Sequence, residues 1–332
     1  MAAATKSKVA ELQTIISRMP LEVFWVAALP ELGLRWRDVV KAVRNSRLPM
    51  TPSSVAKVLR GYVSKVMTPD QLDDLVPRLR LVLTATQTRI WHVINMEDPT
   101  NDALVITSTT QIFSRIHRTL RGSKVARSMR PDVQVIKLGD LIFVSVQLVT
   151  EMKETAPLYL VLPPGQPVAL VSSVNSSKLL KAIVEGIGFQ SYKDAKLYGK
   201  DIHSLLRIND NAWNENPDHL TSIPDYAPQP VITKTGIDYT NKDYNKEYVD
   251  NILGPNPPIL TELNIKMAKN FYDPSRLNKI MNITVKLKSD NVADTLKDWV
   301  AKGALSPTSE FFHIFHQLKS NRLTMNEDNE FQ

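Results

Sequence analysis

A basic side chain recurs at every third position between residues 115 and 130, and no acidic residue lies between Asp102 and Asp132. The six residues are Arg115, Arg118, Arg121, Lys124, Arg127 and Arg130. Guanidinium and ammonium groups pair with phosphate oxygens, and like charges without counter-charges repel one another. The run therefore favours a polyanionic ligand, although a basic helix face that only meets solvent has the same pattern.

The spacing of this run predicts the element that carries it. On a helical wheel the first three arginines share one flank, and the opposite flank is apolar. That apolar flank consists of Ile112, Phe113, Ile116 and Leu120. The pattern predicts an amphipathic helix with a buried stripe and a cationic outer face, followed by a basic tail that ends at Pro131.

The charge of the chain is divided unevenly along its length. Residues 1–208 contain 28 Lys and Arg against 17 Asp and Glu, whereas residues 209–332 contain 13 against 17. Such an asymmetry is typical of proteins that bind nucleic acid or an acidic membrane surface. A membrane is the weaker interpretation, because no apolar stretch approaches the ~18 residues of a spanning helix and the first residues lack the apolar core of a signal peptide.

The composition and the motifs argue against an enzyme. The chain has no cysteine, which excludes disulfides, thiolate catalysis and Cys-ligated metal sites. No phosphate-binding loop, dinucleotide fingerprint, HExxH or calcium-loop pattern occurs. His313 and His316 are the only close histidine pair, and no acid or third ligand accompanies them. We therefore expect no cofactor, no metal and no small-molecule substrate.

Hydrophobic periodicity divides the chain into an α+β protein of several parts. Residues 1–84 read as five short helices, with Thr51-Pro52 and Thr68-Pro69 as capping pairs, which suggests a bundle of the pyrin or death-fold type. Residues 86–208 read as an α+β domain with an antiparallel sheet. Its predicted strands are 89–96, 103–107, 133–138, 141–149, 158–162 and 168–171, and its predicted helices after the basic one are 178–187 and 201–208.

The remaining third of the chain reads as a linker, a module and a tail. Residues 209–257 are rich in Asn, Asp, Pro and Tyr, which predicts a poorly packed linker. Residues 258–322 predict a small β-β-α-β dimerisation module with strands at 259–268, 279–288 and 310–315 and a helix at 290–301. Residues 323–332 are expected to be a disordered tail.

The last predicted strand carries more apolar surface than a small module can easily bury. The residues concerned are Phe311, Phe312, Ile314 and Phe315. We expect them to form a subunit interface, with packing on the chain's own α+β domain as the alternative.

Several segments together resemble the centromere protein N family of kinetochore subunits. The segments are VAEL (9–12), SRMP (17–20), RIWHVINM (89–96), PLYLVLPPGQPVALVSS (157–173), KLYGKDIHSL (196–205), NITVKLKS (282–289) and EFFHIF (310–315). The resemblance follows the order of elements along most of the chain, and no single motif is specific. It implies a nuclear, non-enzymatic scaffold at the centromere that supports kinetochore assembly and chromosome segregation.

The resemblance also implies roles for individual residues. In that family a basic groove holds nucleosomal DNA, an acidic residue of the first helix meets the centromeric histone variant, and the C-terminal module joins centromere protein L. The corresponding residues here are Glu11 for the histone, and Arg18, Arg47, Lys178 and Lys200 for DNA, in addition to the basic run. Tyr198 departs from a basic family position, and the cluster around Arg47 is thinned.

Two other functions remain open from the sequence. One is a protein–protein adaptor in which the helical domain pairs homotypically and the basic face meets acidic partners. The other is an RNA-binding protein, which is disfavoured because no aromatic-rich strand of the RNP type is visible. Salt dependence separates DNA binding from the adaptor, since each phosphate contact steepens the loss of affinity with salt.

Overall fold

A computed structural model provides the fold. It describes residues 2–100, 108–126, 129–150, 155–210, 225–234, 236–238, 241–254, 256–273, 276–309, 311–312, 315 and 318–325. The predicted strand at 103–107 lies outside the described residues. The chain forms two compact units: unit 1 comprises residues 1–88 and 96–192, and unit 2 comprises residues 89–95 and 193–332.

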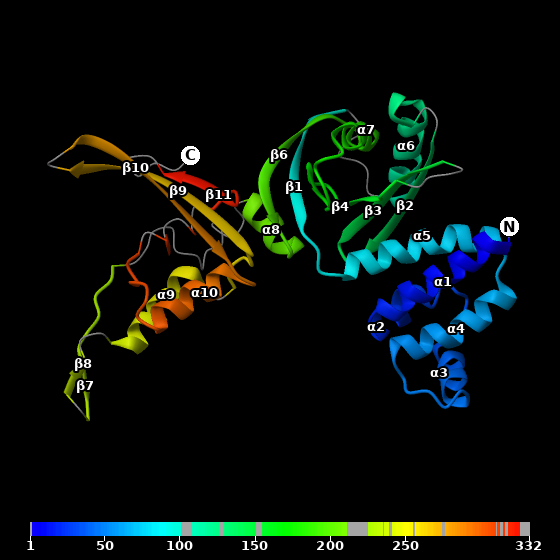
Figure 1. Ribbon diagram of the computed structural model, residues 1–332, viewed down its shortest axis with the longest axis horizontal. Coiled ribbons are helices and arrows are strands. Elements are labelled where there is room, and N and C mark those ends of the chain that lie inside the picture. Colours follow the sequence, from blue (N-terminus) through cyan, green and yellow to red (C-terminus); the bar gives the residue numbers. More distant parts are fainter. Residues whose placement is uncertain are drawn as a thin grey trace. The chain divides into compact units, whose positions relative to one another are not determined.

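Unit 1 begins with a helical bundle (Figure 1). Its elements are α1 (Ala2–Arg18), α2 (Leu21–Val23), the π-helical turn η1 (Phe24–Ala28), α3 (Trp36–Asn45), α4 (Pro52–Val66) and α5 (Pro69–Thr86). The two predicted caps form: the Thr51 side chain accepts from the Ser54 amide, and Thr68 and Gln71 make a reciprocal capping box at the start of α5. One apolar core, which includes Leu12, Ile16 and Phe24, joins the helices.

A six-stranded antiparallel sheet follows, in the order β2-β3-β4-β5-β1-β6. The strands are β1 (Trp91–Pro99), β2 (Arg130–Leu138), β3 (Leu141–Val149), β4 (Leu158–Leu162), β5 (Val168–Val171) and β6 (Phe189–Gly199). The predicted β2–β3 hairpin is confirmed: Leu138 pairs with Leu141, and Gly139 adopts the left-handed φ of +62° that the two-residue turn requires. Strand β6 was not predicted, because its polar residues interrupt the apolar alternation.

Two helices complete the part of unit 1 that carries the basic run. They are α6 (Thr109–Gly122) and α7 (Ser177–Ile187), with the short 3-10 helix η3 (Lys124–Ala126) after α6. Helices α6 and α7 pack very closely, because a Cβ atom added at Gly186 would lie 2.9 Å from the Ile116 Cα atom. The predicted basic tail runs into strand β2, which begins at Arg130 and contains Pro131. Strand β2 stands at the end of the strand order, where a proline is tolerated.

Unit 2 contains an antiparallel hairpin of β9 (Glu262–Asp273) and β10 (Arg276–Lys288), to which β11 (Arg322–Met325) adds in parallel beside β9. Its other elements are α8 (Ile202–Asn209), β7 (Val231–Thr233), β8 (Gly236–Asp238), α9 (Lys242–Leu253) and α10 (Val292–Ala301). Figure 1 shows α9 and α10 side by side next to the three-stranded sheet. Leu263 and Ile265 on β9 and Leu296 on α10 are buried in this unit.

The structure corrects three predictions for the rear of the chain. The predicted linker 209–257 contains helix α9, which buries Tyr248, Val249 and Ile252, since these residues recur at helical spacing. The boundary predicted at 208 lies instead within β6, between residues 192 and 193. The segment expected to be a disordered tail begins with strand β11, which is held by its pairing with β9.

Candidate nucleic-acid interface

Helix α6 presents a basic outer face, as its spacing predicts. Its buried residues are Ile112, Ile116 and Leu120. Arg118 and Arg121 are exposed on the helix and Lys124 is exposed on η3. Arg115 is half-buried and engaged in an interaction of its own, so it contributes less accessible charge than the other two arginines. Arg127 lies outside the described residues.

Phe113 does not belong to the buried stripe of α6. Its side chain is 42% exposed and stacks on His117, with ring centroids 5.7 Å apart. The helical wheel placed Phe113 beside Ile112, but α6 buries only a narrow stripe, because α7 and β2 cover it from one side.

The other basic residues implied by the resemblance lie on separate elements. Lys178 is exposed in the first turn of α7, the helix that packs against α6. Arg18 is exposed at the end of α1, and Arg47 is exposed just after α3 with a positive φ of 54°. These three residues belong to unit 1. Lys200 belongs to unit 2, where its ammonium lies 3.7 Å from the Asp290 carboxylate.

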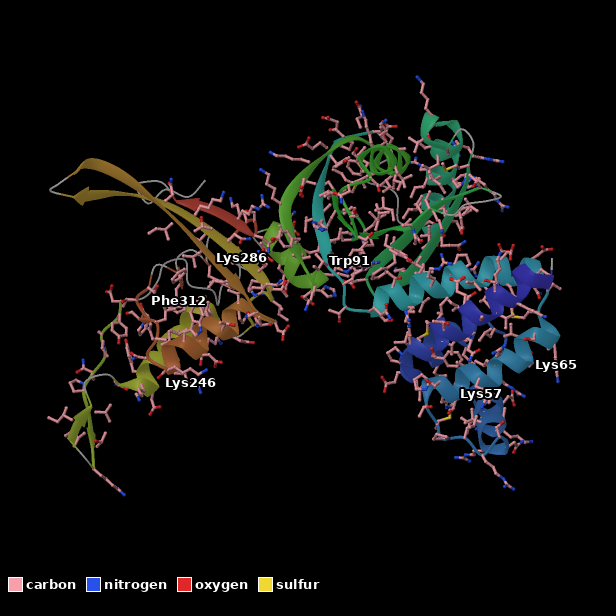
Figure 2. The ribbon with its side chains drawn as sticks, viewed as in Figure 1. Lys57, Lys65, Trp91, Lys246, Lys286 and Phe312 are labelled. Atoms are coloured by element: carbon pink, nitrogen blue, oxygen red, sulfur yellow. The ribbon has the colours of Figure 1, made fainter. Side chains whose placement is uncertain are left out.

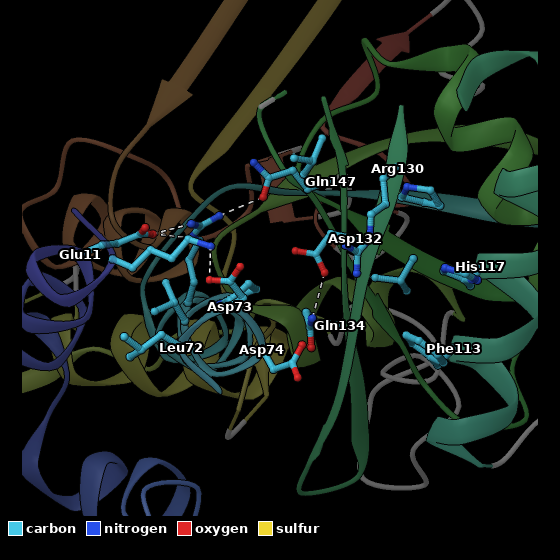
Figure 3. A pocket seen from close by; sticks show the side chains of 17 residues that line it. Glu11, Leu72, Asp73, Asp74, Phe113, His117, Arg130, Asp132, Gln134 and Gln147 are labelled. Carbon is cyan, nitrogen blue, oxygen red and sulfur yellow. Dashed lines mark hydrogen bonds and ion pairs between the residues drawn. The ribbon is translucent and has the colours of Figure 1, made fainter. Parts of the chain in front are cut away.

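Glu11, expected to face a histone, is engaged inside unit 1. Its carboxylate accepts from the Arg80 guanidinium, with Nε 3.0 Å away, and Arg80 also donates to the Gln147 side chain on β3 at 3.0 Å. The three residues line a cavity of about 260 Å³ between α1, α5 and the β2–β3 hairpin (Figure 3). Arg80 lies 69 positions from Glu11 and 67 positions from Gln147 in the sequence. No local pattern could therefore have indicated these contacts.

Two of the phenylalanines expected at a subunit interface, Phe312 (labelled in Figure 2) and Phe315, are part of the core of unit 2. Phe312 and Phe315 are completely buried and Phe311 is half-buried, whereas Ile314 lies outside the described residues. The segment is helical at 311–312 and 315 and not a strand, so the expected interface at Phe312 and Phe315 is wrong. Side chains three positions apart in a helix lie on one face, and Phe312 and Phe315 are both buried within unit 2.

Sequence reasoning missed a basic groove in unit 2. Its volume is about 750 Å³, and its charged lining consists of Lys193, Asp194, Lys196, Glu262, Lys266, Lys286 and Arg322. These residues come from β6, β9, β10 and β11. The number of charged residues gave no sign of this groove, because residues 209–332 as a whole contain more acidic than basic residues. The alternation of polar residues along β9 and β10 was the signal that could have revealed it.

A polar network fixes one side of this groove. Glu262 Oε1 accepts hydrogen bonds from Asn264 at 3.1 Å and from the Tyr198 hydroxyl at 3.1 Å, and it lies 3.0 Å from the Lys286 ammonium. The hydrogen bonds from Asn264 and Lys286 lower the pKa of the Glu262 carboxyl from 4.5 to about 2. Burial, followed by the bond to Glu262, raises the pKa of Tyr198.

No protein-family model matches the chain, and no curated protein matches it either. The structure defines a class, namely a mixed α/β protein of two compact units that contains a helical bundle and an antiparallel six-stranded sheet. Across the described ranges, no helix is both long enough and apolar enough to cross a membrane.

Proposed function

We propose that the protein is a non-enzymatic scaffold that binds duplex DNA through the outer face of α6. The observation that carries the proposal is the pair Arg118 and Arg121, with Lys124 after them, exposed on a stretch of chain without any acidic residue. Phosphate contacts of this kind hold a protein on DNA without reading its sequence. The close packing of α6 on α7 gives the face a rigid support, and Lys178 on α7 adds a further cation.

The resemblance to the centromere protein N family gives this proposal its cellular setting. In that setting the DNA is nucleosomal, the bundle is a pyrin-like death-fold domain, the protein acts in the nucleus at the centromere, and Arg18 and Arg47 extend the DNA contact. Lys200 joins that contact only by exchanging its ion pair with Asp290. Glu11 is less suited to read a histone variant than its sequence position suggests, because Arg80 already occupies its carboxylate.

A partner related to centromere protein L is the second part of the proposal. The buried Phe312 removes the surface first expected for it. Strand β10 stands at the end of the order β10-β9-β11 within the described residues, so its outer edge offers unpaired backbone groups. Addition of a partner strand along β10 is the contact that fits this edge.

Charge reversal on α6 tests the DNA-binding proposal. Arg118→Glu together with Arg121→Glu should lower affinity for mixed-sequence duplexes at least about tenfold at low salt, and equally for every sequence. Lys57→Glu together with Lys65→Glu is the matched control, because both lysines are exposed on α4 of the same unit (Figure 2). Equal affinities of the two variants in a gel-shift titration would reject the assignment of the α6 face.

One observation favours the adaptor as a second candidate. Trp25 and Val26 on η1 are 55% and 71% exposed, and tryptophan is enriched where proteins bind one another. In an adaptor, Trp25→Ser would abolish self-association or partner capture by the bundle. Sedimentation of the Trp25→Ser variant against the parent chain measures the self-association.

A further inference from the structure

Where the structure describes its side chains, the three-stranded sheet of unit 2 has one apolar face and one polar face. The strand register places Lys286 on β10, Asn264 on β9 and Arg322 on β11 in one row across the sheet. Two residues further along β9, Lys266 stands opposite Thr284. Residues that are directly opposite, or two apart along a strand, share a face of a sheet. The cations therefore gather on the side opposite to the buried Leu263 and Ile265.

Strand β6 adds the remaining wall of the groove. The buried Asn321 ties β6 to β9, because its side chain accepts from the Tyr198 amide at 2.6 Å and its backbone carbonyl accepts from Asn264 at 2.8 Å. Lys193 and Lys196 of β6 thereby line the same groove as the sheet face. These hydrogen bonds fix the strands that carry the cations relative to one another.

The positive charge in the groove exceeds what its own carboxylates neutralise. Five cations face two acids. Glu262 is held by Lys286, and Asp194 accepts the backbone amide of Lys196 at 2.8 Å. In the part of the chain that the structure describes, Lys193, Lys196 and Lys266 form no ion pair. Like charges held together without counter-ions favour an anionic ligand.

The lining distinguishes between kinds of anion. It contains no aromatic residue, and Ala195 is its one apolar side chain among the described residues. An acidic peptide would find no pocket for an anchoring side chain, and the bases of a single strand would find no ring on which to stack. Cations spread over four strands match a ligand with successive phosphates better than a single phosphate. A duplex presents such a row, because its bases are paired and its phosphates face outward.

We propose that this groove binds the phosphate backbone of duplex DNA, as a contact in unit 2 that is additional to the α6 face of unit 1. The inference rests on the proposed function in one respect, namely that duplex DNA is the ligand. If the groove binds DNA, the rear of the chain contributes directly to DNA affinity in spite of its acidic composition.

The test uses the full chain with Lys193→Glu and Lys266→Glu, two exposed lysines that leave the Glu262 network intact. Affinity for a short mixed-sequence duplex should fall about tenfold at low salt, and the slope of log affinity against log salt should become less steep by about two. Lys242→Glu together with Lys246→Glu, at two exposed positions of α9, is the matched control, and it should bind within about twofold of the parent. A milder pair, Lys193→Gln and Lys266→Gln, should give about half the change in log affinity if reversal harms folding.

The outcomes separate this inference from the proposed function. If the groove variant binds duplex DNA like the control while reversal at Arg118 and Arg121 weakens binding, only the groove assignment fails. If the groove variant is weakened and the α6 variant is not, only the α6 assignment fails. Loss of inositol hexakisphosphate binding with unchanged duplex affinity would assign the groove to a compact polyphosphate and overturn the proposal.

Discussion

The two basic surfaces of this protein are built in different ways. The α6 face lies on one helix, so its cations follow one another at a spacing that is legible in the chain. The groove of unit 2 collects its cations from β6, β9, β10 and β11, over more than a hundred residues of sequence. A helix can place charge by local periodicity alone, whereas a sheet face depends on strand register and on what covers the other side.

The largest effect is expected from a substitution in the core of unit 2, the unit that contains the groove. Phe312→Asp places a charge at a completely buried position and should unfold unit 2, at a cost of several kcal/mol. Phe113→Asp, at a 42% exposed position on α6, should change stability little. Thermal unfolding followed by circular dichroism compares the two. A folded Phe312→Asp chain with normal unfolding would contradict the burial on which unit 2 depends.

A smaller effect is expected from a substitution that disturbs the packing of α6 on α7. Gly186→Ala brings a Cβ within 2.9 Å of the Ile116 Cα, so α6 must shift and stability should fall by about 2 kcal/mol. Gly61→Ala, in the middle of α4 with no atom within 4 Å, should instead stabilise the bundle by about 0.5–1 kcal/mol. Urea unfolding of both variants gives the sign of each change. Stabilisation by both substitutions would show that α6 and α7 are not in close contact.

The smallest effect is expected from the carboxylate of Glu262 in the groove. Because the pKa of Glu262 is lowered to about 2 in the folded chain, its interactions stabilise unit 2 fully above pH 4.5 and are lost as the pH falls towards 2. The contribution should be about 1 kcal/mol after allowance for solvent screening. Glu262→Gln should make unfolding of unit 2 less sensitive to pH in this range. An unchanged pH dependence would show that the carboxylate is not held by Asn264 and Lys286.

The features of the fold that depend on neighbouring residues could be predicted from the sequence. The threonine caps of α4 and α5, the Gly139 turn and the apolar stripe of α6 are local, and each is confirmed, except that Phe113 does not join the stripe. Residues 311, 312 and 315 were misjudged as part of a strand, because phenylalanine occurs in both helices and strands and the sequence alone does not show which structure forms. The abundance of Asn, Asp, Pro and Tyr suggested a linker where α9 forms.

The candidate site was predicted less completely, for a physical reason. The accessible charges of α6 follow from spacing, whereas the partners of Glu11 and Lys200 are Arg80 and Asp290, which are distant in sequence. Long-range ion pairs decide which charges remain accessible to a ligand. No periodicity in the sequence indicates those pairs. The exposure of Arg118, Arg121 and Lys124 is confirmed, whereas the binding roles of these and the other charged residues stay predictions.

DNA binding through the α6 face can be tested by the salt dependence of duplex binding by the unmodified chain. We expect affinity to fall steeply and linearly with salt on a double logarithmic scale, with each phosphate contact adding about 0.9 to the slope. Arg118→Ala together with Arg121→Ala should reduce that slope by about two. A shallow slope for the parent chain, or one that the α6 substitutions leave unchanged, would contradict DNA binding through this face and favour the adaptor.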